Sequence, residues 1–331
     1  MFVSVIGAGS WGTALAQTLA VAGHDVRMWA RKPEVCESIT NQHVNPRYLS
    51  DVELSDKISA STDIEWVVAG TAAVVIVTPS TLMRETALQI KPYITDETPI
   101  VICSKGVEAQ TGLLPVEVFE AEVGNIDRLA CLMGPNHAEE VILGMPSATT
   151  VASPNAKTAE FFQLLFATET FRTYVDDDVV GAELCAAFKN VIAIAVGVSY
   201  GLGFGDNTAA MIMTRGIAEM SRLVEQCGGK QRTCMGLAGT GDLIVTCTSQ
   251  HSRNRTFGYR LATGTTLEQY REETHMVVEG AYACKTLGTL ALRHNVELPI
   301  TDMVRSIVWE GEDPALVPDR MLKRTLRQEF Y

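Results

Sequence analysis

The feature that most constrains the fold lies at the start of the chain, where an apolar run meets closely spaced glycines. Residues 3–6 (VSVI) are typical of a buried strand, Gly7, Gly9 and Gly12 permit a tight turn, and residues 10–19 have helical periodicity. The free N–H groups and positive dipole end of such a helix suit a pyrophosphate. The alternative is an ordinary strand–turn–helix whose glycines serve only backbone geometry.

The acidic composition limits the partners that the chain can attract. Of 331 residues, 27 are Lys or Arg and 39 are Asp or Glu, so the formal net charge is −12. No global positive field attracts nucleic acid or an anionic membrane, and an anionic ligand must be held by individual cations. The chain starts without a signal-peptide pattern, and we expect no apolar run to be long enough to span a bilayer, which predicts a cytoplasmic protein.

The eight cysteines are scattered, without any C-x-x-C pair, and most lie in apolar segments. This distribution favours reduced core thiols over disulfides or a metal site. The six histidines do not cluster either. We therefore expect no bound metal.

Further apolar runs predict a sheet. Continuous apolarity indicates burial on both faces and hence parallel strands. The expected strands are residues 25–29, 73–77, 99–103, 129–133, 148–152 and 171–175. From Asp178 onward, strand signals vanish and helical stretches follow one another. The sequence thus predicts an α/β Rossmann-like dinucleotide-binding domain over residues 1–177 and an all-α substrate domain over residues 178–331.

The residues after the second predicted strand bear on cofactor choice. A carboxylate there would favour NAD by binding the ribose hydroxyls, whereas arginine accommodates the 2′-phosphate of NADP. The chain has Arg31 and Lys32, with no acid until Glu34. We therefore expect NADP(H) to be accepted and preferred over NAD(H); the alternative is a solvated basic pair at a helix start.

Two other strand ends carry polar or flexible residues. Ligands of open α/β sheets bind beyond the carboxyl ends of the strands. Lys105 closes one strand within residues 104–106 (SKG), and residues 134–138 (GPNHA) close another and offer backbone N–H groups at a helix start. A lysine at a strand end is most often only solvated, but its place at this edge favours a functional role.

Lys189 is the strongest single candidate. The helix predicted over residues 183–199 is apolar all round except for Lys189 and Asn190, which is typical of a buried helix. Burial disfavours a charged lysine, so a general acid/base is a sensible use for one. A lysine that snorkels or pairs with a carboxylate for structure is the alternative.

Three later segments could complete a site. Residues 236–243 (GLAGTGDL) predict a backbone bend that presents Asp242, because no buried strand precedes them. Residues 252–255 (SRNR) combine hydroxyl, guanidinium and amide donors, which suit a phosphate dianion, although a solvated basic loop fits as well. Residues 277–280 place the carboxylate of Glu279 between an apolar pair and a glycine.

Taken together, these motifs resemble bacterial NAD(P)-dependent glycerol-3-phosphate dehydrogenase over essentially the whole chain. The matching segments are residues 7–16 (GAGSWGTALA), 103–106 (CSKG), 134–135 (GP), 188–191 (FKNV), 214–216 (TRG), 239–243 (GTGDL), 252–255 (SRNR) and 278–280 (VEG). The resemblance implies reversible hydride transfer between NAD(P)H and dihydroxyacetone phosphate, giving sn-glycerol 3-phosphate for phospholipid synthesis.

The resemblance also implies roles for individual residues. Lys189 resembles the family's proton acceptor, a base toward the C2 hydroxyl and an acid toward the ketone. Substrate contacts are implied at Lys105, Gly134, Asn136, Lys189, Asp242, Ser252, Arg253 and Asn254. Cofactor contacts are implied at Gly7, Gly9, Ser10, Trp11, Gly12, Arg31, Lys32, Lys105, Ala138, Arg253, Val277 and Glu279.

The chain departs from the family pattern at three positions. The family usually has a small hydroxyl residue in place of Asn136, leucine in place of Phe188 and aspartate in place of Tyr200. The first departure affects a substrate contact, and the other two are expected to affect packing. A related hydroxyacid dehydrogenase or ketopantoate-type reductase, or a non-enzymatic dinucleotide sensor, remains the alternative reading.

Two expectations concern the rest of the molecule. A dimer is the default for a soluble oligomer, so a homodimer is possible on this ground alone. The C-terminal segment over residues 313–331 has helix-compatible apolar spacing and is expected to pack against its own domain.

Overall fold

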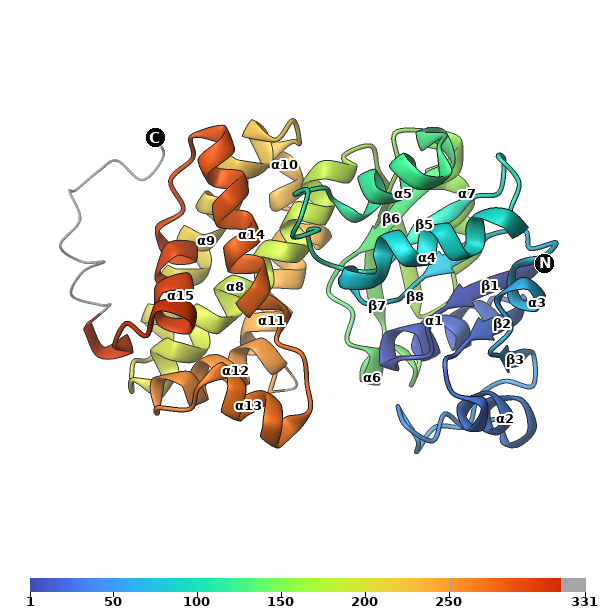
Figure 1. The fold of residues 1–331 in the computed structure, drawn as a ribbon, viewed down its shortest axis with the longest axis horizontal. Coiled ribbons are helices and arrows are strands. Elements are labelled where there is room, and N and C mark those ends of the chain that lie inside the picture. The colour runs from blue at the N-terminus through green and yellow to red at the C-terminus, as the bar shows by residue number, and fades with distance from the viewer. Residues whose placement is uncertain (251, 317–331) are drawn as a thin grey trace. The chain divides into compact units, whose positions relative to one another are not determined.

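The computed structural model of the chain describes residues 1–250 and 252–316 (Figure 1). The chain forms two compact units. One consists of Met1–Ala186 and Gly228–Asp242, and the other of Ala187–Cys227 and Leu243–Tyr331. From residue 317 on, the expected C-terminal helix lies outside the described residues.

A single eight-stranded sheet forms the centre of the first unit. Its order is β3-β2-β1-β4-β5-β6-β7-β8, and every neighbouring pair is parallel except β6–β7, which is antiparallel. The strands are β1 (Phe2–Ile6), β2 (Asp25–Trp29), β3 (Ile58–Ser61), β4 (Val74–Ile76), β5 (Ile100–Ile102), β6 (Leu129–Met133), β7 (Ser147–Ala152) and β8 (Phe171–Asp176).

The predicted Rossmann-like sheet is confirmed, with two corrections. β3 was not predicted, because its sequence ISAS has only one large apolar side chain. The expectation that all strands run parallel is wrong for β7 and β8, which are parallel to each other but opposed to the other six strands. Apolarity reports that a strand is buried, and its direction depends on how the connecting segment returns.

Helices cover both faces of this sheet in three layers. The side chains of β1 alternate, so that Val3 and Val5 join one core cluster while Ile6 joins the other. α1 (Ser10–Val21), α2 (Pro33–Gln42), α6 (Ala138–Val141) and α7 (Ala156–Phe166) pack on the first face. α3 (Ile64–Val68), α4 (Met83–Ile90) and α5 (Pro115–Val123) pack on the second.

Helices alone form the described part of the second unit. It contains most of α8 (Val179–Gly201) and α11 (Asp242–Thr248), with α9 (Asp206–Gln226), α12 (Arg253–Ala262), α13 (Leu267–Thr274), α14 (Glu279–His294) and α15 (Pro299–Glu310). α10 (Gln231–Cys234) belongs to the first unit. The units divide the chain differently from the boundary predicted between residues 177 and 178, because Ala182, Ala186 and Ala238 pack in the core of the sheet.

α8 is the most apolar of the described helices. It is long and apolar enough to cross a membrane by length and composition, so our expectation about apolar runs was wrong in that respect. Within the protein, 89% of its most apolar window is buried, and every residue from 181 to 199 is buried. This burial is typical of a core helix.

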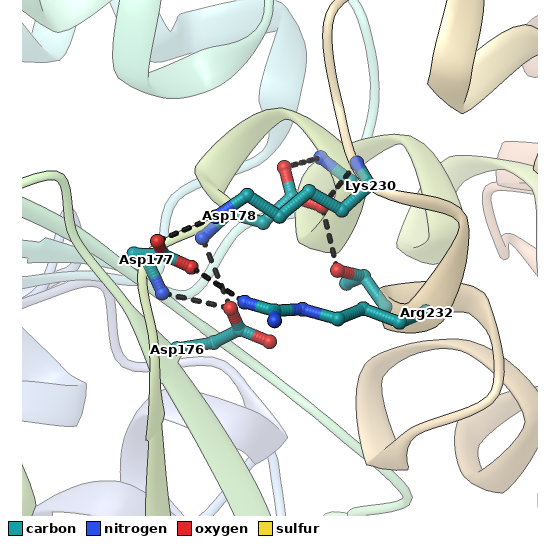
Figure 2. Close-up of polar contacts among 7 residues, drawn as sticks. Asp176, Asp177, Asp178, Lys230 and Arg232 are labelled. Atoms are coloured by element: carbon teal, nitrogen blue, oxygen red, sulfur yellow. Dashed lines mark hydrogen bonds and ion pairs between the residues drawn. The ribbon is translucent and has the colours of Figure 1, made fainter.

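Asp178 links residues 230–233, which follow α9, to the start of α8 by hydrogen bonds (Figure 2). Its carboxylate accepts hydrogen bonds from the backbone N–H of Gly181 at 2.8 Å and of Lys230 at 2.7 Å, and from the Thr233 hydroxyl at 2.6 Å. Beside it, Asp177 pairs with Lys230 and Arg232, and the hydrogen bond from Lys230 lowers the pKa of Asp177 to about 2. The buried cap thus ties Lys230 and Thr233 to the start of α8 within the first unit.

None of the eight cysteines, all of which lie in the described part of the chain, forms a disulfide. Seven are buried and Cys227 is half-buried. The sulfur atoms of Cys185 and Cys234 lie 3.6 Å apart.

In the second unit, Glu219 is a buried carboxylate that caps the start of α15. It accepts hydrogen bonds from the backbone N–H groups of Ile300 at 2.7 Å and Thr301 at 3.4 Å. Burial raises the pKa of Glu219 from its usual 4.5 to about 7, despite these bonds. The folded protein therefore holds this proton more tightly than the unfolded chain does.

We expect Glu219 to make stability fall as pH rises. Its contribution is fully present below pH 4.5 and is lost as the pH approaches 7, a change of roughly 3 kcal/mol in the free energy of unfolding. Glu219→Gln keeps an oxygen for Ile300 and removes the titration, so the variant should show a flatter curve between pH 5 and pH 8, measured by urea denaturation. Parallel curves for the two proteins would contradict this assignment.

Candidate active site

The glycine turn is built by close approach of backbones. Gly7 has φ +121°, and a Cβ there would lie 2.8 Å from the carbonyl oxygen of Val77. A Cβ on Gly12 would lie 1.9 Å from the carbonyl oxygen of Gly7. Both positions therefore require glycine for α1 to start directly against the end of β1, as the sequence predicted.

Gly9 differs from its two neighbours in this turn. A Cβ on Gly9 would meet no atom within 4 Å, so this glycine borders open space. Gly9 is also the N-cap of α1 and has no side chain to accept the N–H group of Trp11 or Gly12. The first turn of α1 has no acidic residue. Open space at an uncapped, 12-residue helix N-terminus fits the pyrophosphate of a dinucleotide.

Arg31 and Lys32 follow β2, which lies beside β1 in the sheet. Both side chains are exposed, and Lys32 Nζ lies 3.8 Å from the carboxylate of Glu34. Glu34 stands in the first turn of α2, with Lys32 as the N-cap. Arg31 is therefore an exposed residue at the carboxyl end of β2, the edge of the sheet at which ligands of open α/β folds bind.

Lys105 and Asp242 form an ion pair within the first unit. Lys105 follows β5, and its Nζ lies 2.8 Å from Oδ2 of Asp242, whose side chain is only 1% exposed. A π-helix at Leu237–Gly241 directly precedes Asp242 and replaces the simple bend that we expected. Such π-helical turns are frequent at functional sites.

Gly134, Asn136 and Ala138 follow β6. A Cβ on Gly134 would lie 2.9 Å from Oγ1 of Thr149. The Asn136 amide donates to the carbonyl of Ala148 at 3.0 Å, while its Oδ1 is buried with no hydrogen-bond partner among the described residues. An amide oxygen in this state can accept a hydrogen bond from a ligand hydroxyl. Ala138 is buried at the start of α6.

Lys189 lies in the buried middle of α8, in the second unit, with 7% of the residue exposed. Its ammonium donates a hydrogen bond to the hydroxyl of Thr246 at 2.9 Å. The predicted burial of this lysine is thus confirmed. Thr246 was not predicted as part of the site, and nothing in its sequence context distinguishes it from other threonines.

Asn190 joins the starts of two other helices in the same unit. Its Nδ2 donates to Glu279 at 3.2 Å, and its Oδ1 accepts from the amide of Asn254 at 2.9 Å. Asn254 in turn accepts from the backbone N–H of Gly280 at 2.9 Å. The network links Asn254 and Glu279, two of the site residues that the resemblance implies, through Asn190. Asn190 itself was missed, although a second polar residue on an apolar helix was a visible signal.

The remaining candidates in this unit stand at helix starts. Ser252 is the N-cap of α12 and accepts a hydrogen bond from the N–H of Arg255 at 3.3 Å, so this segment is a capped helix start and not a loop. Arg253 is exposed, and Val277 is 54% exposed. The guanidinium of Arg255 instead lies 5.2 Å from the ring centre of Tyr200.

The two family departures expected to affect packing lie in different surroundings. Phe188 is fully buried in α8. Tyr200 stacks with Arg255 and donates a hydrogen bond to Asp206 at 3.0 Å, which raises the pKa of Tyr200. Tyr200 is thus held by contacts within the second unit.

Comparison with known proteins assigns the chain to a family. Models described as the N-terminus and the C-terminus of NAD-dependent glycerol-3-phosphate dehydrogenase match residues 2–159 and 178–319. The chain belongs to the NAD-dependent glycerol-3-phosphate dehydrogenase family. Its resemblance at the sequence level is thereby confirmed.

Individual members of the glycerol-3-phosphate dehydrogenase family match along their whole length. A glycerol-3-phosphate dehydrogenase [NAD(P)+] of Bacillus pumilus is 44% identical over 99% of this chain and 96% of its own, and that of Shouchella clausii is 42% identical over 99% and 97%. The crystal structure of glycerol-3-phosphate dehydrogenase from Coxiella burnetii has a TM-score of 0.92 at 37% identity, covering 98% of this chain and 99% of that one. A ketopantoate reductase from Ralstonia eutropha, at 17% identity and a TM-score of 0.62, shares the fold alone.

The contrast between Gly9 and Gly12 predicts that the same substitution affects cofactor binding at one position and stability at the other. Gly9→Ala should fold normally, because its Cβ enters open space, but should weaken NADPH binding roughly tenfold by filling that space. Gly12→Ala should lower the free energy of unfolding by about 2 kcal/mol or more, because its Cβ overlaps the Gly7 carbonyl. Thermal unfolding and NADPH fluorescence titration measure the two effects. Equal loss of stability in both variants would contradict the distinction.

Proposed function

We propose that this chain is an NAD(P)-dependent glycerol-3-phosphate dehydrogenase that reduces dihydroxyacetone phosphate to sn-glycerol 3-phosphate, reversibly. The observation that carries the proposal is the burial of Lys189 in the largely apolar helix α8, with its Nζ hydrogen-bonded to the hydroxyl of Thr246. Membership of the family supports it. In the reductive direction the product would supply phospholipid synthesis in the cytoplasm.

Lys189 is the proposed general acid and base. When bound, the dihydronicotinamide ring supplies a hydride to the carbonyl carbon of the substrate. Lys189 donates a proton from Nζ to the carbonyl oxygen as negative charge develops there, and the same nitrogen accepts the proton in the oxidative direction. The hydroxyl of Thr246 fixes the position of Nζ.

The phosphate group of the substrate requires cations, because the net charge of the chain is −12. Exposed Arg253 at the start of α12 is the proposed phosphate ligand, with Ser252 and Asn254 beside it. A guanidinium and a helix N-terminus both favour a dianion. In the first unit, Lys105, Gly134, Asn136 and Asp242 are the proposed substrate contacts, supported by the ion pair and by the free Oδ1 of Asn136.

The cofactor is proposed to bind at the glycine turn. Gly7 and Gly12 shape the turn, Gly9, Ser10 and Trp11 border the pyrophosphate, and exposed Arg31 with Lys32 meets the 2′-phosphate, which favours NADP(H) over NAD(H). Lys105, Ala138, Arg253, Val277 and Glu279 complete the proposed set. Asn190 supports Glu279 in this role by its hydrogen bond.

Substitution of Lys189 should lower kcat, whereas substitution of Arg253 should raise KM. Lys189→Ala should keep NADPH binding and lose about 10²–10⁴-fold in kcat with dihydroxyacetone phosphate, because it removes the proton donor. Arg253→Ala should mainly raise KM for dihydroxyacetone phosphate. Initial rates of NADPH oxidation, with ketopantoate as the competing substrate, provide the measurement. A near-normal kcat in Lys189→Ala, or turnover of ketopantoate alone by the wild type, would refute the proposal.

Arg31→Asp tests the cofactor preference. The ratio of kcat/KM for NADPH to that for NADH should fall roughly tenfold or more, because one charge-assisted hydrogen bond of about 1.5–3 kcal/mol is lost. Lys157→Asp is the matched control, since it makes the same change of charge at an exposed position at the start of α7. If both variants change the ratio equally, Arg31 has no specific role.

A further inference from the structure

Asn45 is a fully buried side chain, 0% exposed, in the segment between α2 and β3. Its Nδ2 donates to the carbonyl oxygen of Ala8 at 3.0 Å and to Oγ1 of Thr13 at 2.8 Å. Its Oδ1 accepts from the backbone N–H groups of Arg47 at 3.1 Å and Tyr48 at 3.2 Å. A primary amide has two donor hydrogens and two acceptor lone pairs, so these four bonds use its whole capacity.

The two residues to which Asn45 donates stand on either side of the glycine turn. Ala8 precedes Gly9 in the turn, and Thr13 lies in the first turn of α1, where its N–H bonds to the carbonyl of Gly9 at 2.9 Å. The amide of Asn45 therefore bridges the interval that contains Ser10 and Trp11. A bridge of this kind fixes where the N–H groups of the helix start point.

The segment that carries Asn45 is itself held in place. His43 ends α2 in the left-handed region at φ 53°, and its carbonyl accepts from the N–H of Leu54 at 2.7 Å. Farther along, the N–H of Ser55 donates to Oε1 of Gln17 on α1 at 2.9 Å. Asn45 thus contacts the turn from a loop that is itself hydrogen-bonded to α1, and this bonding restricts the position of the Asn45 side chain.

We propose that Asn45 is a positioning residue for the dinucleotide, holding the glycine turn in the shape that receives the pyrophosphate. The inference rests on the proposed placement of the cofactor at this turn. Because the pyrophosphate is common to both cofactors, Asn45 should matter equally for NADPH and NADH, unlike Arg31. Asn45 touches no reacting atom, so the turnover of fully loaded enzyme should depend on it little.

The test is Asn45→Asp in the full-length protein. This change keeps the shape and the acceptor oxygen for Arg47 and Tyr48, but removes both N–H donors and places a carboxylate oxygen against the carbonyl of Ala8. Kd for NADPH and for NADH should rise together, by roughly tenfold or more. At saturating cofactor, kcat should stay within about threefold of wild type, and KM for dihydroxyacetone phosphate should change little.

Ser153→Ala is the matched control. Ser153 is 1% exposed and, like Asn45, uses its side chain to bond a distant carbonyl, that of Leu129 at 2.7 Å, at the start of β6. Strand starts lie at the edge of the parallel strands opposite to the glycine turn. The control should lower the melting temperature without changing either Kd. Thr13→Val, which removes one of the two acceptors, serves as a milder variant if Asn45→Asp does not fold.

The outcomes separate the inference from the proposed function. An unchanged Kd for both cofactors in a folded Asn45→Asp or Thr13→Val variant overturns the positioning role, as does a loss of kcat at saturation with Kd unchanged. An increase in Kd confined to NADPH also overturns it. Failure of the wild type to oxidise NADPH with dihydroxyacetone phosphate, in the same assay, would instead refute the proposed function.

Discussion

Burial of α8 is the constraint on which the rest of the structure depends. Because residues 181–199 are all buried, each polar side chain among them needs a hydrogen-bond partner. Glu183 accepts from the N–H of Val116 at the start of α5, and burial raises its pKa well above the usual range. Lys189 and Asn190 bind Thr246 and Glu279. In the first unit α8 thus bonds the start of α5, and in the second unit it bonds α11 and the start of α14.

Local sequence was sufficient for much of this fold. The apolar runs predicted every strand except β3, and β2 and β6 have the bounds expected. The glycine turn, the exposed Arg31 after β2 and the buried Lys189 also follow from short-range patterns, since each depends on periodicity or on a strand end. These features could be predicted because the forces that produce them act between residues close in the chain.

What the sequence did not predict depends on pairing across long separations. β7 pairs antiparallel with β6, and β8 then pairs in parallel with β7. The Lys105–Asp242 pair joins residues 137 positions apart. Asn45, Asn190 and Thr246 are polar residues of ordinary types whose roles come from partners on other elements. Periodicity indicates whether a side chain is buried, but its hydrogen-bond partners on other elements are known only from the fold.

The cap at Asp178 gives α8 a fixed starting point, so the number of residues between Asp178 and Lys189 matters. Eleven helical steps separate Asp178 from Lys189, a rise of about 16 Å. One residue inserted or deleted between them would turn Lys189 by about 100° around the helix axis relative to the cap at Asp178. The number of residues in this stretch therefore sets the direction in which the Lys189 side chain leaves the helix.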